Sequence, residues 1–136
     1  MPRPLRHGTT IVLLLPLLLT ASCSGSGDDQ SSPQSLTAAV YKDLHAGHFQ
    51  KACALVSPAA LKRITDTGSD CASYIADHVD GAKRASYIDV KVDAKAIQVN
   101  GDTAVVPESA VTFGGQPSSD GDDKVILLNG KWFAAN

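Results

Sequence analysis

The sequence predicts an α+β fold, with helices in the first half of the folded region and an antiparallel sheet in the second. Apolar residues first recur at the three- and four-residue spacing of a helix face, and from residue 88 they alternate with polar residues, as in a strand with one wet face. Asn100-Gly101 and Asn129-Gly130 are typical of hairpin turns. Helices followed by a run of strands is the order of an α+β domain.

The first 22 residues are typical of a secretory signal peptide. Arg3 and Arg6 precede an apolar run over residues 11–19, and the small residues Thr20-Ala21-Ser22 follow it. Nine apolar residues are too few for a membrane-spanning helix, which needs about 18. We therefore expect residues 1–22 to direct export and to be removed.

Cys23 directly follows these small residues. It resembles the lipidated cysteine of bacterial lipoproteins, although Thr20 stands where that motif usually has Leu. The resemblance implies a lipid on Cys23 and anchoring to the outer face of the cell membrane, because two acyl chains hold a protein firmly. The alternative is a secreted protein that is cleaved near Ser22.

A polar stretch separates Cys23 from the rest of the chain. Residues 24–35 are rich in Ser, Gly, Asp and Gln and offer no apolar side chain whose burial would offset the entropy of ordering. We therefore expect residues 23–35 to form a lipidated, flexible tether and residues 36–136 to form one domain.

The cysteine count predicts one disulfide. If Cys23 carries lipid, Cys53 and Cys71 remain as a pair in an oxidising compartment. A zinc site would need more ligands and shorter cysteine spacings than these two provide. We expect a Cys53–Cys71 bond and neither a metal site nor a cofactor.

Net charge argues against one class of partner. Removing Arg3 and Arg6 with the signal peptide leaves 10 Lys and Arg residues against 14 Asp and Glu, a net charge of −4. A mildly acidic domain does not attract phosphate backbones, so nucleic acid is not an expected partner.

Two helical segments are expected before residue 57. Leu36, Val40 and Leu44 lie on one face of a helix that Gly47 is suited to end, and residues 49–56 follow as a second, short helix.

Two more helices are expected before residue 82. Ser57-Pro58 is typical of a helix start, and Asp70 is suited to cap a further helix. Gly81 fits the position just after that helix. Its apolar stripe contains Cys71, Tyr74, Ile75 and His78.

The strands are expected from residue 88 onward. Ile97 and Val99 have the opposite parity to Ile88, Val90 and Val92, so a bulge is expected within residues 93–96. Pro107 marks an edge or bulge, because proline cannot donate to a ladder. The remaining strands are predicted at residues 102–113, 124–128 and 131–135.

At this point the chain resembles the NTF2-like (cystatin-like) superfamily, and in particular small actinobacterial lipoproteins of that type. The likeness is carried by residues 47–58, Cys71, residues 100–106 and residues 128–133. It implies a strongly bent, four-stranded antiparallel sheet that curls around the helices to form a cone with an apolar pocket. It does not imply a particular chemistry, because this fold hosts many activities.

A pocket inside such a cone would be lined by strand residues without a carboxylate. The strand residues assigned to the inner face are Ile88, Val90, Val92, Val105, Val125 and Leu127. Asp89, Lys91 and Asp93 fall on the outer face. The candidate pocket residues are Tyr41, Tyr74, His78 and Trp132, with Trp132 buried against the helices.

The histidines offer limited chemistry. His45 and His48 are spaced to share a metal, but Gly47 interrupts the helix between them and no third ligand is near, so we expect surface histidines. His78 lies on an apolar stripe and is either a partly buried core histidine or a general base.

Two function classes remain. The first is a non-catalytic module at the cell surface that binds a small apolar ligand or a protein partner. The second is a pocket enzyme of the isomerase or dehydratase type, in which a His or Asp faces the cone. The missing inward carboxylate favours the first class.

Overall fold

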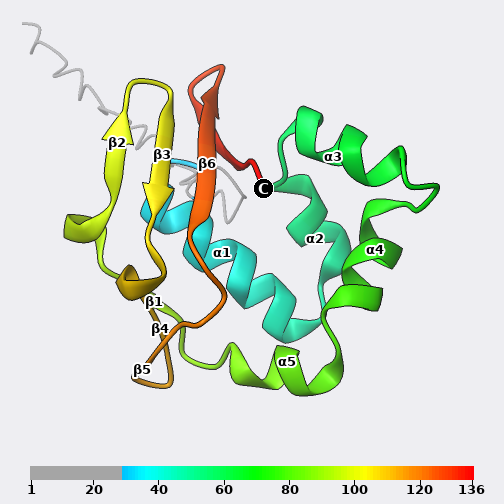
Figure 1. The fold of residues 1–136 in the computed structure, drawn as a ribbon, viewed down its shortest axis with the longest axis horizontal. Helices are drawn as coiled ribbons and strands as arrows, with labels where there is room; N and C mark the ends of the chain where they lie inside the picture. Colours follow the sequence, from blue (N-terminus) through cyan, green and yellow to red (C-terminus); the bar gives the residue numbers. More distant parts are fainter. Residues whose placement is uncertain (1–28) are drawn as a thin grey trace, which may run out of the picture.

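The computed structural model describes residues 29–136, which form helices followed by strands and so confirm the α+β class (Figure 1). The predicted signal peptide, Cys23 and the first part of the predicted tether lie outside the described residues. No helix within residues 29–136 combines the length and the apolar character that crossing a membrane requires.

Helix α1 (Pro33–Ala46) is the central element of the fold. Ser32 caps it: the Ser32 side chain accepts from the backbone N–H of Ser35, and the Ser35 side chain accepts from the backbone N–H of Ser32. Gly47 ends the helix with φ 74°, a left-handed conformation that glycine adopts without strain. The predicted end at Gly47 is therefore confirmed.

The predicted boundary between tether and domain is wrong, because residues 30–35 belong to the folded domain. Gln30 is buried against the last strand: its Nε2 donates to the carbonyl of Trp132 at 2.9 Å, and its own carbonyl accepts from the Trp132 N–H at 3.0 Å. Polar side chains in this segment make hydrogen bonds to the domain and to the helix start, which composition alone does not reveal.

Helices α2 (Phe49–Ala54), α3 (Pro58–Thr65) and α4 (Cys71–His78) form where they were predicted. The Ser57 side chain accepts from the backbone N–H of Ala60, and Asp70 accepts from that of Ser73. The predicted Cys53–Cys71 disulfide is confirmed and joins α2 to the first residue of α4, with 6.0 Å between the two Cα atoms.

Helix α5 (Gly81–Ser86) was not predicted. Gly81 does not follow helix α4 as its capping glycine but opens α5, and the Asp80 side chain caps this helix by accepting from the Lys83 N–H at 2.8 Å. The six residues of α5 carry no apolar stripe, so hydrophobic periodicity gives no signal for it.

The strands form two antiparallel sheets, so the predicted single sheet is wrong. The four-stranded sheet has the order β2 (Gln98–Asn100), β3 (Thr103–Val106), β6 (Asp123–Leu128) and β7 (Lys131–Ala134). The three-stranded sheet has the order β1 (Lys91–Val92), β4 (Val111–Phe113) and β5 (Gln116–Pro117). Both predicted hairpins are present, with Asn100 paired to Thr103 and Leu128 paired to Lys131.

Two 3₁₀ turns divide the strands between the sheets. One, at Ala94–Ala96, lies within the segment where a bulge was predicted, and the other, at Glu108–Ala110, follows Pro107. The Asp93 N–H donates to the carbonyl of Ala110 at 2.8 Å. The predicted strand over residues 102–113 is therefore two strands, one in each sheet.

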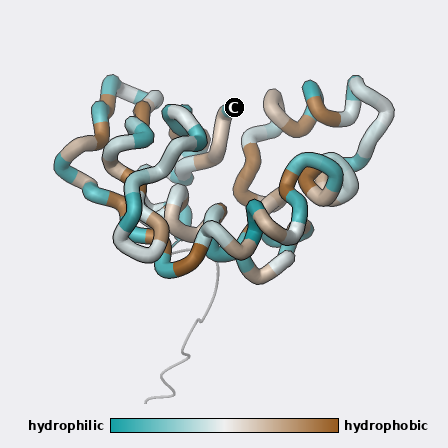
Figure 2. Tube along the Cα trace, turned by 60° about the horizontal axis from the view of Figure 1, so that its bottom comes forward, coloured by the Kyte–Doolittle hydropathy of each residue, from teal (hydrophilic) through white to brown (hydrophobic). Residues whose placement is uncertain are grey.

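The hydrophobic core has two parts, and helix α1 contributes to both. Tyr41 and Leu44 from α1 pack with Tyr87 and with residues of the small sheet. Leu36 and Ala39 pack with the inner face of the four-stranded sheet. Figure 2 shows the strands and helices α2–α4 as two lobes on either side of the C-terminus, with α1 joining them in Figure 1.

The inner face of the large sheet differs from the prediction at β3. Ala104 and Val106 are buried, whereas Val105 lies on the other face. Ile88, predicted to face inward, is 49% exposed because the chain turns at Asp89, whose φ is 47°. Alternation cannot continue through a residue in the left-handed region.

Candidate functional site

A cavity of about 270 Å³ lies between helices α1–α4 and the last residues of the chain. Its apolar wall combines side chains from several helices and the α2–α3 connection, namely Val40, Leu44, Val56, Ile64, Ile75 and Val79. A concave, mostly apolar space with a few polar groups is the usual form of a small-molecule site. We therefore take this cavity as the candidate site.

Three of the four predicted pocket residues line this cavity. Tyr41 comes from α1, and Tyr74 and His78 come from α4. Trp132 does not border it: this ring is buried in the second part of the core, with Leu36 and Val125 among its neighbours. The expected burial of Trp132 against the helices is therefore confirmed, while the structure places it away from the cavity.

Asp123 is the polar group of the cavity that the sequence analysis missed. It is the first residue of β6 and pairs with Val106, so it lies on the inner face of the sheet with Val125. The Tyr41 hydroxyl donates to its Oδ2 at 3.0 Å. The expectation that no carboxylate faces inward is wrong, because the strand begins one residue earlier than predicted and Asp123 shares the parity of Val125.

The surroundings of Asp123 raise the pKa of its carboxyl group above the value it has in water. Burial is the main cause and raises the pKa of Asp123 from 3.8 to about 6, and the negative charges of Asp120 and Asp122 add to the effect. The hydrogen bond from Tyr41 opposes it. Burial and the adjacent Asp123 charge in turn raise the pKa of the Tyr41 phenol. This carboxyl is therefore poised to change charge near neutral pH.

A second polar group borders the same cavity. Lys83 Nζ lies 3.5 Å from Asp120 Oδ1, and burial together with a hydrogen bond to Asp120 raises the pKa of Tyr87. The rings of Tyr41, Tyr87 and Phe113 pack against one another with centroids 4.9 to 5.0 Å apart. This aromatic cluster fixes the position of the Tyr41 hydroxyl beside Asp123.

His78 stands at the exposed rim of the cavity. Its ring stacks on Tyr74 with 4.1 Å between centroids, and its Nδ1 donates to the Tyr74 carbonyl at 2.7 Å. The prediction of a partly buried core histidine is wrong, because the side chain is exposed.

A smaller void of about 30 Å³ adjoins the polar end of the cavity. Five residues border both spaces, namely Val40, Tyr41, Asp123, Ala134 and Asn136. Thr37 borders the void but not the larger cavity. Thr37 is 3% exposed, and its hydroxyl has no hydrogen-bond partner among residues 29–136. A buried hydroxyl without a partner is costly in a folded protein.

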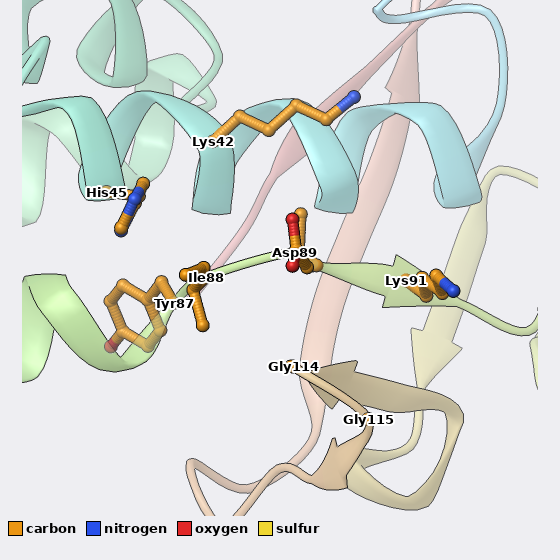
Figure 3. A pocket seen from close by; sticks show the side chains of 9 residues that line it. Lys42, His45, Tyr87, Ile88, Asp89, Lys91, Gly114 and Gly115 are labelled. Carbon is orange, nitrogen blue, oxygen red and sulfur yellow. The ribbon is translucent and has the colours of Figure 1, made fainter.

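A wider groove of about 800 Å³ lies between α1 and the segment before β1 (Figure 3). Figure 3 shows Lys42 and His45 on its α1 side, and Asp89 and Lys91 on the opposite side. The structure confirms that Asp89, Lys91 and Asp93 are exposed. Most of the residues that border this open groove are exposed, whereas most of those that border the 270 Å³ cavity are at least partly buried.

The remaining histidines are surface residues, as predicted. His45 Nδ1 donates to the Arg84 carbonyl at 2.8 Å, and His48 Nδ1 lies 3.7 Å from Asp43 Oδ1. Across residues 29–136, no group of three or more His, Cys, Asp or Glu side chains is placed to hold a metal ion.

Replacing Asp123 by Asn should remove a pH dependence of stability. In the native protein the pKa of Asp123 is raised from 3.8 to about 6, so its stabilising contribution is complete below pH 3.8 and is lost as the pH rises through 6. Asn stays neutral and still accepts from Tyr41. We expect the free energy of unfolding of Asp123→Asn, relative to that of the wild type, to rise by about 2 to 3 kcal/mol from pH 4 to pH 7.5.

Urea unfolding at both pH values measures this difference. Asp122→Asn is the matched control, because it removes an exposed neighbouring charge and should shift the comparison far less. An Asp123→Asn variant whose stability follows that of the wild type at every pH would show that the carboxyl titrates normally.

Comparison with known proteins adds no relative to this description: no family model matches the chain, and neither a curated protein nor a solved structure shows significant similarity. Functional inference therefore depends on the geometry of the site.

Proposed function

We propose that the chain is an exported lipoprotein, anchored through Cys23 to the outer face of the cell membrane, whose NTF2-like domain binds a small and largely apolar ligand without altering it. The signal peptide and the cysteine that follows it support the anchor. The α+β order and the resemblance of residues 47–58, 100–106 and 128–133 to NTF2-like lipoproteins support the domain assignment.

The observation that carries the binding function is the cavity of about 270 Å³ beside Tyr41 and Asp123. Its apolar and aromatic walls would remove the body of a ligand from water, and burial of apolar surface is the main favourable contribution to small-molecule binding. The few polar groups at one end would set the orientation of the ligand.

Filling the cavity should abolish binding. Ile75 borders the cavity from α4, so Ile75→Trp places a larger ring in that space, whereas Ala76→Trp adds the same ring to the exposed side of the same helix. We expect 2-phenylethanol to bind the full chain in lipid nanodiscs and the Ala76→Trp variant alike, and to lose at least 10-fold in affinity for Ile75→Trp.

Ligand-observed NMR, with empty nanodiscs as the blank, measures the affinities. Thermal unfolding checks that both variants are folded. Equal binding to folded Ile75→Trp and Ala76→Trp would place the ligand outside this cavity and refute the proposal.

An acid–base enzyme is the second candidate, and the pKa of about 6 at Asp123 favours it. A carboxyl that titrates near neutral pH inside an apolar cavity is suited to accept or donate a proton. Against it, Asp123 Oδ2 is occupied by Tyr41, and His78 uses Nδ1 for a backbone carbonyl at the rim. Hydrogen–deuterium exchange at the α-carbon of phenylacetone distinguishes the two: exchange that Asp123→Asn abolishes would favour the enzyme.

Cys23→Ala should release the protein from the membrane. Without the thiol no lipid is attached, and the polar residues that follow have no affinity for the bilayer interior. Fractionation of cells should move the protein from the membrane to the medium, whereas Ser24→Ala should leave it on the membrane. Full retention of the Cys23→Ala protein would contradict the proposed anchor.

A further inference from the structure

We propose that the ligand is a primary amine, whose ammonium group lies among Thr37, Tyr41 and Asp123 while its apolar body fills the adjoining cavity. This inference rests on the proposed binding function and adds the chemical class of the ligand.

Asp123 is a carboxylate without a cationic partner. No Lys, Arg or His side chain of residues 29–136 lies within ion-pair distance of it. Lys83, which borders the same cavity, is paired with Asp120. Within residues 29–136, its side-chain hydrogen bond comes from Tyr41, which occupies Oδ2 and leaves Oδ1 free of side-chain donors. A partly buried negative charge is stabilised strongly by a bound cation.

The charges around Asp123 favour a cation over an anion. Helix α1 presents Tyr41, and the segment before β6 presents Asp120 and Asp122. Helix α5 presents Lys83, which is paired, and His78 of α4 stands at the rim. Lys124, the residue after Asp123 on β6, is exposed, and it also borders the 30 Å³ void. The carboxylates of Asp120, Asp122 and Asp123 outnumber the two lysines, Lys83 and Lys124, at the polar end of the cavity, which disfavours an anionic ligand.

Thr37 is an independent reason to expect a donor group at this end. Its buried hydroxyl has no partner among the described residues and borders the same 30 Å³ void as Asp123. That volume is about the share of one water molecule in the liquid, so it suits one ammonium group. An ammonium has three N–H donors, which can satisfy Asp123 Oδ1 and Thr37 Oγ1 together.

The void and the larger cavity adjoin, which determines the rest of the ligand. Five residues border both spaces, among them Tyr41 and Asp123, so the two spaces are direct neighbours and a ligand with its head in the void would extend its body toward the apolar cavity. Tyr41 and Tyr74 both border the larger cavity, and aromatic side chains favour a nearby cation through cation–π attraction. An alkyl- or arylalkylamine fits this arrangement.

Three probes of one shape test the charge preference on the full chain in nanodiscs. 2-Phenylethylamine is cationic at pH 7.5, 2-phenylethanol is neutral and phenylacetate is anionic. We expect the amine to bind about 10- to 100-fold more tightly than the alcohol, because hydrogen bonds to charged groups are the stronger class, and phenylacetate to bind most weakly.

Two variants assign the preference to its residues. Asp123→Asn should lower the affinity for the amine to that for the alcohol and should leave the affinity for the alcohol unchanged. Thr37→Val removes the unpartnered hydroxyl without leaving a hole and should weaken the amine about 10-fold while the fold stays as stable. Asp122→Asn removes a charge that does not border the cavity and should leave the preference intact.

Lowering the pH gives a readout without mutation. Between pH 7.5 and pH 5 Asp123 takes up its proton, so the amine should lose about 10-fold in affinity and the alcohol should not change.

The possible failures are distinguishable. Equal binding of amine and alcohol to the wild type would overturn this inference and leave the binding function standing. An amine preference that survives in Asp123→Asn would place the cation elsewhere and also overturn it. Absence of binding by all three probes would refute the proposed function together with the inference.

Discussion

Replacing Trp132 by Ala is expected to lower the free energy of unfolding by about 3 to 5 kcal/mol, a large share of the stability of a small domain. The ring is 7% exposed and packs against Leu36 and Ala39 of α1 and against Val125 of β6. Its removal leaves a cavity at the contact between the helix and the sheet, which the small neighbours Ala39 and Ala104 cannot fill.

Phe133→Ala is the matched control for this substitution. Phe133 is the next residue of β7, lies on the opposite face of the sheet and is only partly buried, so its loss should cost markedly less. Chemical denaturation of both variants measures the difference. If Trp132→Ala melts within a degree or two of the wild type, the ring does not stabilise this contact.

Loss of the Cys53–Cys71 disulfide is the second large effect. We expect the Cys53→Ser/Cys71→Ser variant to be less stable by about 3 kcal/mol, because the bond closes a loop between residues 18 positions apart and restricts the unfolded chain. The bond also joins α2 to α4, two helices that border the candidate cavity.

A reducing agent provides the control for this expectation. Dithiothreitol should lower the midpoint of unfolding of the wild type to that of the double variant and should leave the variant unchanged. A double variant as stable as the oxidised wild type would show that the bond adds nothing to stability, and free thiols in protein taken from cells would show that it does not form.

The helices could be predicted well because their signals are local. Ser57-Pro58, Asp70 and Gly47 act at helix ends through bonds to residues at most four positions away, so the sequence itself contains both partners. The disulfide could be predicted for a similar reason, since only two cysteines remain once Cys23 is set apart. Helix α5 lacks an apolar stripe and is recognisable only by the cap at Asp80.

The division into two sheets could not be predicted, because it depends on contacts between distant residues. The bond from the Asp93 N–H to the Ala110 carbonyl connects two 3₁₀ turns that look like independent strand irregularities in the sequence. The parity of β3 presents the same difficulty. Ala104, Val105 and Val106 are all apolar, so their pattern does not say which face is buried.

Tyr41, Tyr74 and His78 of the cavity could be predicted from the sequence, but its buried carboxylate, Asp123, could not. The stripe of α4 indicated Tyr74 and His78, and both border the cavity. Asp123 was missed through an error of one residue at the start of β6, and strand ends are the least certain feature of a sequence pattern. Its bond to Tyr41 spans 82 positions and has no local signal.

The two hydrogen bonds between Gln30 and Trp132 determine how far the domain can reach from an anchor at Cys23. Seven peptide steps separate Cys23 from Gln30, and a fully extended chain covers at most about 3.6 Å per step, or about 25 Å in total. The segment between Cys23 and Gln30 is thus roughly three-fifths as long as a tether ending at residue 35 would be. It attaches at the edge of β7, so tension on the lipid proposed at Cys23 would act first on the Gln30–Trp132 hydrogen bonds at this sheet edge.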